Sequence, residues 1–202
     1  LILHSEVNFS TIQTIAASDV SCNKFENILY TAVVILRFSD LQIINYYSKI
    51  SSIRFPYIPG FLSFREAPAV LEIFEELLDP PDVLICDGQG IAHPRGLGLA
   101  SHLGLFLNLP TIGCAKSVLV GSYSEPLSEK GSHSPLIYRG KKVGVALRSR
   151  PDVKPIFISC GHKIGLPDAV RLVLHTCLRY RIPEPLRIAH QLVNELRIKN
   201  QK

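Results

Sequence analysis

The 202-residue sequence has no Met, no Trp and only five Cys. The cysteines are odd in number and widely spaced, and no C-x-x-C pair occurs. This pattern excludes a disulfide scaffold and the spacing of a zinc site, and it is typical of reduced core residues in a cytoplasmic protein. Because the chain begins with Leu1 and contains no Met, we expect its natural start to lie upstream.

The chain also has no long hydrophobic run. Residues 97–115 carry no formal charge, but Pro110 interrupts them. Proline divides such a stretch, so a buried helix followed by a buried strand explains it better than a membrane span. We therefore expect no association with a membrane.

Charged residues make up 19% of the chain and hydrophobic residues 47%, an ordinary globular composition that excludes a disordered chain. The length predicts a single domain over 1–202. Residues 1–138 hold 8 Lys and Arg against 13 Asp and Glu, whereas residues 139–202 hold 14 against 4. A strongly basic last third indicates a polyanionic partner, for which nucleic acid is the main candidate.

Hydrophobic periodicity predicts a mixed sheet covered by helices, in the α/β class. The first three strands are separated by short polar breaks and are expected to form an antiparallel meander. A later strand, helix and strand predict a parallel pair with a right-handed crossover. Residues 121–135 are expected to form an exposed loop. The expected strands are 11–20, 28–38, 41–50, a short run within 81–88, 110–115, 143–148 and 155–159; the expected helices are 62–79, 97–108, 166–180 and 184–199.

Three acids stand at the ends of these elements: Asp19, Glu66 and Asp87. Carboxylates that converge at strand ends suit Mg²⁺, a hard ion that prefers oxygen ligands. The alternative is that each acid caps a helix or a turn. Asp87 is the strongest candidate, because a buried apolar run leads directly to it and glycines leave room beside it.

Other side chains could carry a proton or a charge. His93 and His190 are candidate proton carriers or ligands, although a histidine is more often a surface or core residue. Lys116 follows a strand expected to run parallel to the one that ends at Asp87, so it could face a phosphate there; it could equally be an ordinary flanking lysine. A thiol nucleophile at Cys160 is disfavoured, because its neighbour His162 is badly placed to act as its base.

The segment FPYIPG, 55–60, holds Tyr57 between two prolines. A stiff loop that presents aromatic rings could wedge between bases. The alternative is an aromatic loop packed on its own core. The nearby glycine-rich DGQGIAHPRGLG lacks the G-K-[ST] ending of a phosphate loop, which leaves a nucleotide-binding fold as a weak alternative.

Taken together, the chain resembles the endonuclease V family. The resemblance reaches from Asp19 to His190 and rests on several long motifs in the right order. These motifs are RFPYIPGFLSFRE (54–66), PDVLICDGQGIAHPRGLGLASHLG (81–104), PTIGCAKS (110–117), VKPIFISCGHKIGL (153–166) and YRIPEPLRIAH (180–190).

The resemblance implies a ribonuclease H-like fold and an Mg²⁺-dependent endonuclease, with Mn²⁺ as a substitute ion. The implied substrate is nucleic acid that contains deoxyinosine or inosine, cut at the second phosphodiester bond 3′ of the lesion. We expect a monomer. A second hypothesis is a catalytically silent protein of the same fold that binds inosine or branched DNA, and such a relic should lack one of the three acids. A third is nucleic-acid association through the basic last third alone.

The resemblance also implies roles for individual residues. Asp19, Glu66 and Asp87 match the metal-binding carboxylates and His190 a position near the metal. Lys116 matches a lysine that contacts the cleaved phosphate, and His93 a histidine beside the active centre. The base wedge matches Pro56, Tyr57, Ile58 and Pro59, and the hypoxanthine pocket matches Gly60, Leu62, Gly88, Leu99 and Ala115. The chain departs from the family around Asp19, where Ser18 precedes the acid and Cys22 replaces a tyrosine.

Overall fold

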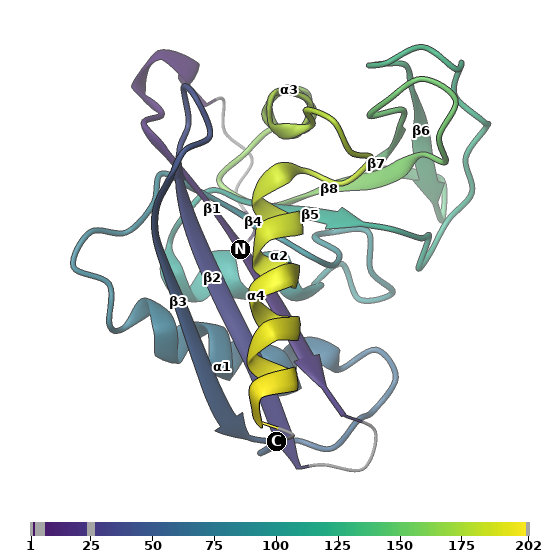
Figure 1. Cartoon of the computed structure of the whole chain (residues 1–202). Helices are drawn as coiled ribbons and strands as arrows, with labels where there is room; N and C mark the ends of the chain where they lie inside the picture. Colours follow the sequence, from purple (N-terminus) through teal and green to yellow (C-terminus); the bar gives the residue numbers. More distant parts are fainter. Residues whose placement is uncertain (1, 3–6, 24–26, 201–202) are drawn as a thin grey trace.

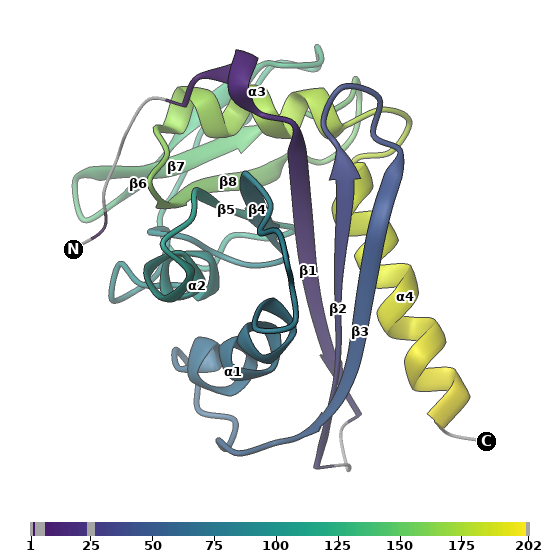
Figure 2. The same cartoon turned by 90° about the vertical axis from the view of Figure 1, so that its left-hand side faces the viewer.

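The structure is a computed structural model that describes residues 2, 7–23 and 27–200. One mixed sheet of eight strands forms its centre, in the order β3-β2-β1-β4-β5-β8-β7-β6. Helices cover both faces of this sheet (Figures 1 and 2). The expected α/β class, a mixed sheet flanked by helices, is confirmed. The strands are β1 (Thr14–Cys22), β2 (Ile28–Arg37), β3 (Ile43–Ser52), β4 (Val83–Cys86), β5 (Thr111–Ala115), β6 (His133–Tyr138), β7 (Lys141–Leu147) and β8 (Ile156–His162). The helices are η1 (Phe9–Thr11), α1 (Leu62–Phe74), α2 (Leu99–Leu107), α3 (Leu166–Thr176) and α4 (Glu184–Asn200).

Strand directions agree with the sequence-based expectation. β1, β2 and β3 pair antiparallel as a meander. β4 pairs parallel to both β1 and β5, with α2 as the connection between β4 and β5. The carboxyl ends of β1, β4 and β5 therefore lie at one edge of the sheet, where side chains that follow the three strands meet.

Two hydrophobic layers sandwich the sheet. Successive side chains of a strand point to opposite faces, so Ala16 packs under α1 and α2 while Ile15 and Ala17 pack under α3 and α4. Figure 2 shows α1 and α2 on the side of the sheet opposite to α4. Each face of the sheet thus has its own core. The candidate site lies between the two, at the carboxyl ends of β1, β4 and β5.

The sequence-based boundaries differ most from the structure at three places. β6 lies partly within the expected exposed loop 121–135; Pro135 concealed it, because proline is tolerated only in edge strands, and β6 is an edge of this sheet. α1 ends at Phe74 rather than at 79, because the amides of Glu76 and Leu77 bond to carbonyls three residues back in a tighter turn, and Leu78 beyond it is 95% exposed. α3 ends at Thr176 rather than at 180, because Cys177 takes an extended conformation.

The cysteines and the helices bear on two further expectations. All five cysteines are free, and four are buried, whereas Cys22 is exposed instead of lying in the core. No helix in the described part of the chain has the length and apolar character needed to cross a membrane.

Candidate active site

The site begins with the register of the parallel strands. Ser18 of β1 pairs with Cys86 of β4, and Cys86 pairs with Gly113 of β5. Asp19 and Asp87 each follow one of these paired residues, so the parallel register brings both acids to the same sheet edge. Ser18 is buried within an uninterrupted β1, so its presence before the acid does not disturb the strand.

Asp87 forms an ion pair across this edge. The Nζ of Lys116, directly after β5, lies 2.5 Å from Oδ2 of Asp87. The expected proximity of these two residues follows from the parallel pairing of β4 and β5. The ammonium group is partly open to solvent, so it is placed to contact an anion beside the carboxylate.

Asp19 has a different partner. Its Oδ2 lies 2.8 Å from Nδ1 of His190, which α4 brings to the sheet from the other end of the chain. Burial raises the pKa of the Asp19 carboxyl, and the negative charge of Asp87 raises it further, while the hydrogen bond with His190 opposes this rise. The carboxylate is therefore held in an environment that favours a compensating positive charge.

Glu66 lies in the second turn of α1 and completes the acidic group. Burial raises its pKa to about 8, with smaller contributions from the charges of Asp19 and Asp87. Among the described residues, its carboxyl group makes no hydrogen bond and no ion pair, so two carboxylate oxygens remain available as ligands. Cys22, which departs from the family pattern, lies near this turn, where its Sγ accepts a hydrogen bond from Nη2 of Arg65 at 3.4 Å.

The donor set fits a hard divalent cation in its chemistry. Asp19, Glu66 and Asp87 offer only carboxylate oxygens, and their mutual repulsion is the kind that a divalent ion relieves. Within residues 2, 7–23 and 27–200, no three His, Cys, Asp or Glu side chains form a group ready to hold a metal ion as they stand. One oxygen each of Asp19 and Asp87 is engaged by His190 and Lys116. Binding of a cation would therefore require these side chains to move.

A cavity of about 380 Å³ opens beside Asp87 and Lys116. This volume lies in the range of small-molecule pockets. All five residues of the predicted hypoxanthine pocket line it. Of the four predicted wedge residues, Tyr57 lines it, whereas Pro56, Ile58 and Pro59 do not. The predicted residues in its wall are Tyr57, Gly60, Leu62, Gly88, His93, Leu99 and Ala115. The sequence analysis assigned no role to six further residues that complete the wall: Ser63, Gln89, Gly98, Ser117, Val118 and Leu119. The first four lie within the motifs that carry the family resemblance.

The wall is built from close backbone approaches. A Cβ on Gly98 would stand 2.3 Å from the carbonyl oxygen of Gln89, and a Cβ on Gly113 would stand 2.2 Å from the amide nitrogen of Gly90. A larger residue at Gly113 on β5 would force the 88–98 loop away from the sheet, and one at Gly98 would push apart the two ends of that loop. These glycines therefore explain how a loop can pack tightly enough to form a pocket wall.

The loop that carries Tyr57 projects into solvent. Tyr57 is 66% exposed and Ile58 is also exposed, so the alternative of an aromatic loop packed on its own core is wrong for these two side chains. Arg95 holds the end of this loop by donating a hydrogen bond from Nη1 to the carbonyl oxygen of Gly60 at 2.8 Å. An exposed ring at the mouth of a cavity is placed to contact whatever enters it.

The two remaining sequence candidates have different surroundings. His93 is buried in the pocket wall, and its pKa is lowered by burial and by the nearby Arg95, which favours neutral imidazole. Cys160 and His162 are buried in β8, and burial raises the pKa of the Cys160 thiol to about 11. A thiol that stays protonated near neutral pH is a poor nucleophile, so the structure agrees that a Cys160 nucleophile is disfavoured.

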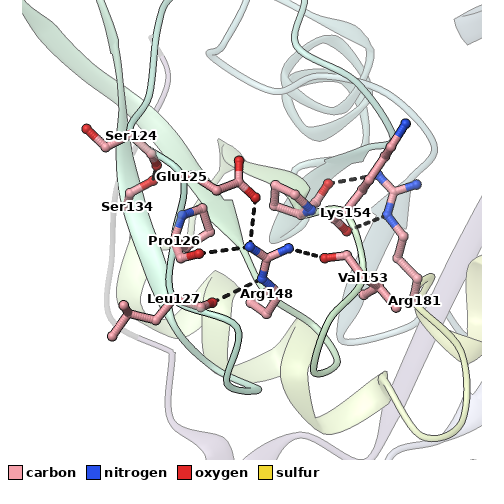
Figure 3. Close-up of polar contacts among 10 residues, drawn as sticks. Ser124, Glu125, Pro126, Leu127, Ser134, Arg148, Val153, Lys154 and Arg181 are labelled. Carbon is pink, nitrogen blue, oxygen red and sulfur yellow. Dashed lines mark hydrogen bonds and ion pairs between the residues drawn. The ribbon is translucent and has the colours of Figure 1, made fainter.

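Arg181, which the sequence analysis did not single out, supports the site by binding the backbone beside it. Arg181 donates hydrogen bonds to the carbonyl oxygens of Lys116, Lys154 and Pro155, at 2.8, 2.7 and 2.7 Å. Figure 3 shows its guanidinium group reaching the 154–155 segment. It thereby ties the residue after β5 to the start of β8 and to the segment that leads into α4.

A second arginine, Arg148, is buried and holds the loop at residues 125–127, which follows the pocket-lining residues 115–119 in the chain. It donates to Glu125 at 2.7 Å, to the carbonyls of Pro126 and Leu127 at 2.8 and 3.0 Å, and to the carbonyl of Val153 (Figure 3). The sequence does not show these contacts, since every partner of the Arg148 and Arg181 side chains except Val153 lies more than twenty residues away.

Comparisons with known proteins identify this arrangement. The family model Endonuclease V matches residues 1–191. The Endonuclease V of Nostoc punctiforme is 52% identical over 183 residues, which cover 91% of this chain and 83% of that protein. The Endonuclease V of Dictyoglomus turgidum is 52% identical over 158 residues, 78% of this chain and 69% of that protein.

Solved structures agree. The Endonuclease V of Streptomyces avermitilis superimposes with a TM-score of 0.94 at 36% identity, covering 100% of this chain and 89% of the other. The Endonuclease V of Ciona intestinalis, solved with a 23mer DNA that contains an inosine followed by a ribo-adenosine, has a TM-score of 0.87 at 26% identity, with coverages of 100% and 92%. Fold and site thus define a nuclease with a nucleic-acid substrate. The chain belongs to the Endonuclease V family.

Proposed function

We propose that this nuclease recognises hypoxanthine, the base of deaminated adenosine, and hydrolyses the second phosphodiester bond 3′ of it in an Mg²⁺-dependent reaction. The products would carry a 3′-hydroxyl and a 5′-phosphate. The observation that carries this proposal is the ion pair of Asp87 and Lys116 at the mouth of a cavity, with Asp19 and Glu66 at the same sheet edge. The inosine-containing DNA bound by the Ciona relative supports the choice of base.

Asp19, Glu66 and Asp87 would hold the ion, and Mn²⁺ would substitute for Mg²⁺. When bound, Mg²⁺ supplies charge neutralisation at the phosphate and a more acidic water. Lys116 would move from Asp87 to the phosphate as the carboxylate turns to its ligand role. His190 orients Asp19 through Nδ1 and remains open to solvent on its other side, where it can exchange protons.

The cavity would accept the flipped base. Gly60, Leu62, Gly88, Leu99 and Ala115 present backbone and small apolar surface to it, with His93 in the same wall. Tyr57 and its neighbours Pro56, Ile58 and Pro59 would fill the space that the base leaves in the stack. The exposure of Tyr57 and its place at the cavity support this role.

The decisive experiment compares cleavage of matched DNA and RNA strands, each with one inosine, in the presence and absence of Mg²⁺. We expect inosine-dependent, Mg²⁺-dependent cutting that Asp87→Ala abolishes while binding to the inosine strand stays measurable. Retained cleavage by Asp87→Ala would remove this residue from the metal site. Equal cutting of strands without inosine would contradict the proposed base.

If the protein were a catalytically silent binding protein, one of the acids Asp19, Glu66 and Asp87 should be missing. All three acids are present and lie at one edge, which favours the enzyme. If nucleic acid bound through the basic last third alone, its affinity should depend steeply on salt and show no preference for inosine. The same matched strands measure that preference.

A further inference from the structure

A row of aromatic rings leaves the cavity along the outer surface of α1 and α2. We call Phe55, Phe61, Phe64, His102 and Phe106 the aromatic row. Phe64 lies at its centre, with ring centroids 5.8 Å from Phe55, 5.7 Å from Phe61 and 4.9 Å from His102. His102 lies 5.2 Å from Phe106 at the far end. The row is therefore continuous from the Tyr57 loop to the last turn of α2.

Two rings of the row are unusually open to solvent. Phe64 is 45% exposed and Phe106 is 66% exposed, whereas the core-facing side chains of both helices are buried against the sheet. Single exposed apolar residues need no explanation, but a connected group of them marks an interaction surface. These rings are not required to fill the core beneath the helices.

The row is continuous with the candidate base pocket. Phe61 stands between Gly60 and Leu62, both of which line the cavity. The guanidinium carbon of Arg95 lies 3.9 Å from the centroid of Phe61, and the same arginine holds the carbonyl oxygen of Gly60. A nucleic-acid strand that places one nucleotide in the cavity therefore brings the adjoining nucleotides over Phe61 and Phe64.

Charge indicates which kind of partner fits. Arg95 supplies a cation at the pocket end of the row. At the other end Lys163 donates to the carbonyl oxygen of Asn108, which caps α2 two residues after Phe106. Glu75 shares a groove with Phe106 beyond this point, and its carboxylate would repel a phosphate, which sets an end to the row. Aromatic rings flanked by cations fit a nucleic-acid strand, because its bases can stack on the rings while its phosphates pair with the cations.

We propose that the aromatic row is a stacking platform for unpaired nucleotides adjoining the target nucleotide. The partner is single-stranded nucleic acid, bound without sequence preference because every base offers a face for stacking. This inference rests on the proposed function, since it assumes that a nucleotide enters the cavity. The inference goes beyond the proposed function by assigning a second contact surface, on α1 and α2.

The test uses Phe64→Leu, Phe106→Leu and the double variant, which retain apolar volume and remove the ring. Two inosine strands are compared, one that ends close to the inosine and one extended by about ten nucleotides on each side. With the long strand we expect each single variant to raise Kd and KM about 5- to 150-fold, the range for removing one stacked base, and the double variant to raise them further. The short strand should be cut at the wild-type rate, and Phe106→Trp should retain long-strand binding.

Tyr46→Leu is the matched control, because Tyr46 is an exposed ring on β3, away from the row. Equal loss with short and long strands, or no loss with either, overturns the platform. If Phe64→Leu lowers the melting temperature, Phe106→Leu alone decides, since its ring is the more exposed. Self-association that Phe106→Leu abolishes in sedimentation would assign the row to a protein partner and also overturn the proposal.

Failure of the platform can be told apart from failure of the proposed function. Wild-type protein that cuts no inosine strand would contradict the proposed function. In that case, binding of a long strand without inosine still tests the row, because stacking does not require the lesion. Normal inosine cleavage with unchanged binding by the double variant would remove the platform and leave the proposed function intact.

Discussion

Nδ1 of His190 lies 2.8 Å from Oδ2 of Asp19, although 171 positions separate the two residues in the chain. The contact joins α4 to β1 at the edge where the acidic group gathers. It fixes the direction of the Asp19 carboxylate and opposes the rise of its pKa. The first prediction follows from this bond.

His190→Ala should weaken the binding of Mg²⁺ by about 10- to 100-fold, as for other residues that orient a metal ligand. Mg²⁺ titrations of the cleavage rate, together with Mn²⁺ binding measured by calorimetry, give the affinity. His133→Ala on β6 serves as the control, because His133 is exposed and outside the site. Equal metal affinity in wild type and His190→Ala would show that the Asp19 contact does not support the ion.

The raised pKa of Glu66 predicts how stability depends on pH without metal. The unfolded chain loses this proton near the ordinary value of 4.5, whereas the folded protein keeps it to about 8. Between these values the folded state binds more protons, so this group makes stability fall as pH rises. In a chelating buffer, the melting temperature of Glu66→Gln relative to wild type should therefore increase from pH 5 to pH 8. A difference that does not change with pH, as expected of the control Glu75→Gln, would contradict this.

Tyr57→Ala should weaken binding to an inosine strand by about 5- to 150-fold, equivalent to about 1 to 3 kcal/mol for one stacking contact. The reason is its exposed ring at the mouth of the cavity. Fluorescence anisotropy in the presence of Ca²⁺ measures Kd without cleavage. Tyr57→Phe should keep most of the affinity, and an unchanged affinity for Tyr57→Ala would exclude the wedge role.

Arg181→Lys keeps the charge and loses the fork that binds three carbonyl oxygens. Each missing hydrogen bond from a charged donor is worth about 1.5 to 3 kcal/mol, so the melting temperature should fall clearly. Because one of these carbonyls belongs to Lys116, kcat should fall more than KM rises. A loss of stability with kcat unchanged would mean that Arg181 supports the fold alone.

The basic last third predicts a contrasting result for surface lysines. Lys141→Gln and Lys154→Gln alter exposed side chains, so the melting temperature should stay within about 1 °C of wild type. If either lysine binds a phosphate, its replacement should lower the slope of log Kd against log salt by about 1, with the preference for inosine unchanged. A changed preference with an unchanged slope would argue against a role in backbone binding.

Local sequence determined much of this protein. Alternation and periodicity predicted the meander, the strand–helix–strand unit and the mixed α/β class, because these patterns depend on neighbours within a few residues. The adjacency of Asp87 and Lys116 followed in turn, since parallel strands end at one sheet edge. The roles expected for the acids and for the base pocket came from the resemblance and remain predictions.

Other features depended on the tertiary structure. β6 was hidden by Pro135, which becomes intelligible only once its strand is seen at an edge. The partner of Asp19, the clamp formed by Arg181 and the aromatic row on α1 and α2 join residues far apart in the chain. The raised pKa of Glu66 on α1 likewise arises from burial and from the charges of Asp19 on β1 and of Asp87 directly after β4. The sequence alone thus determined most of the elements and the mixed α/β class. Packing decided the edge strand β6, the ends of α1 and α3, and which side chains meet, because burial and charge act through space.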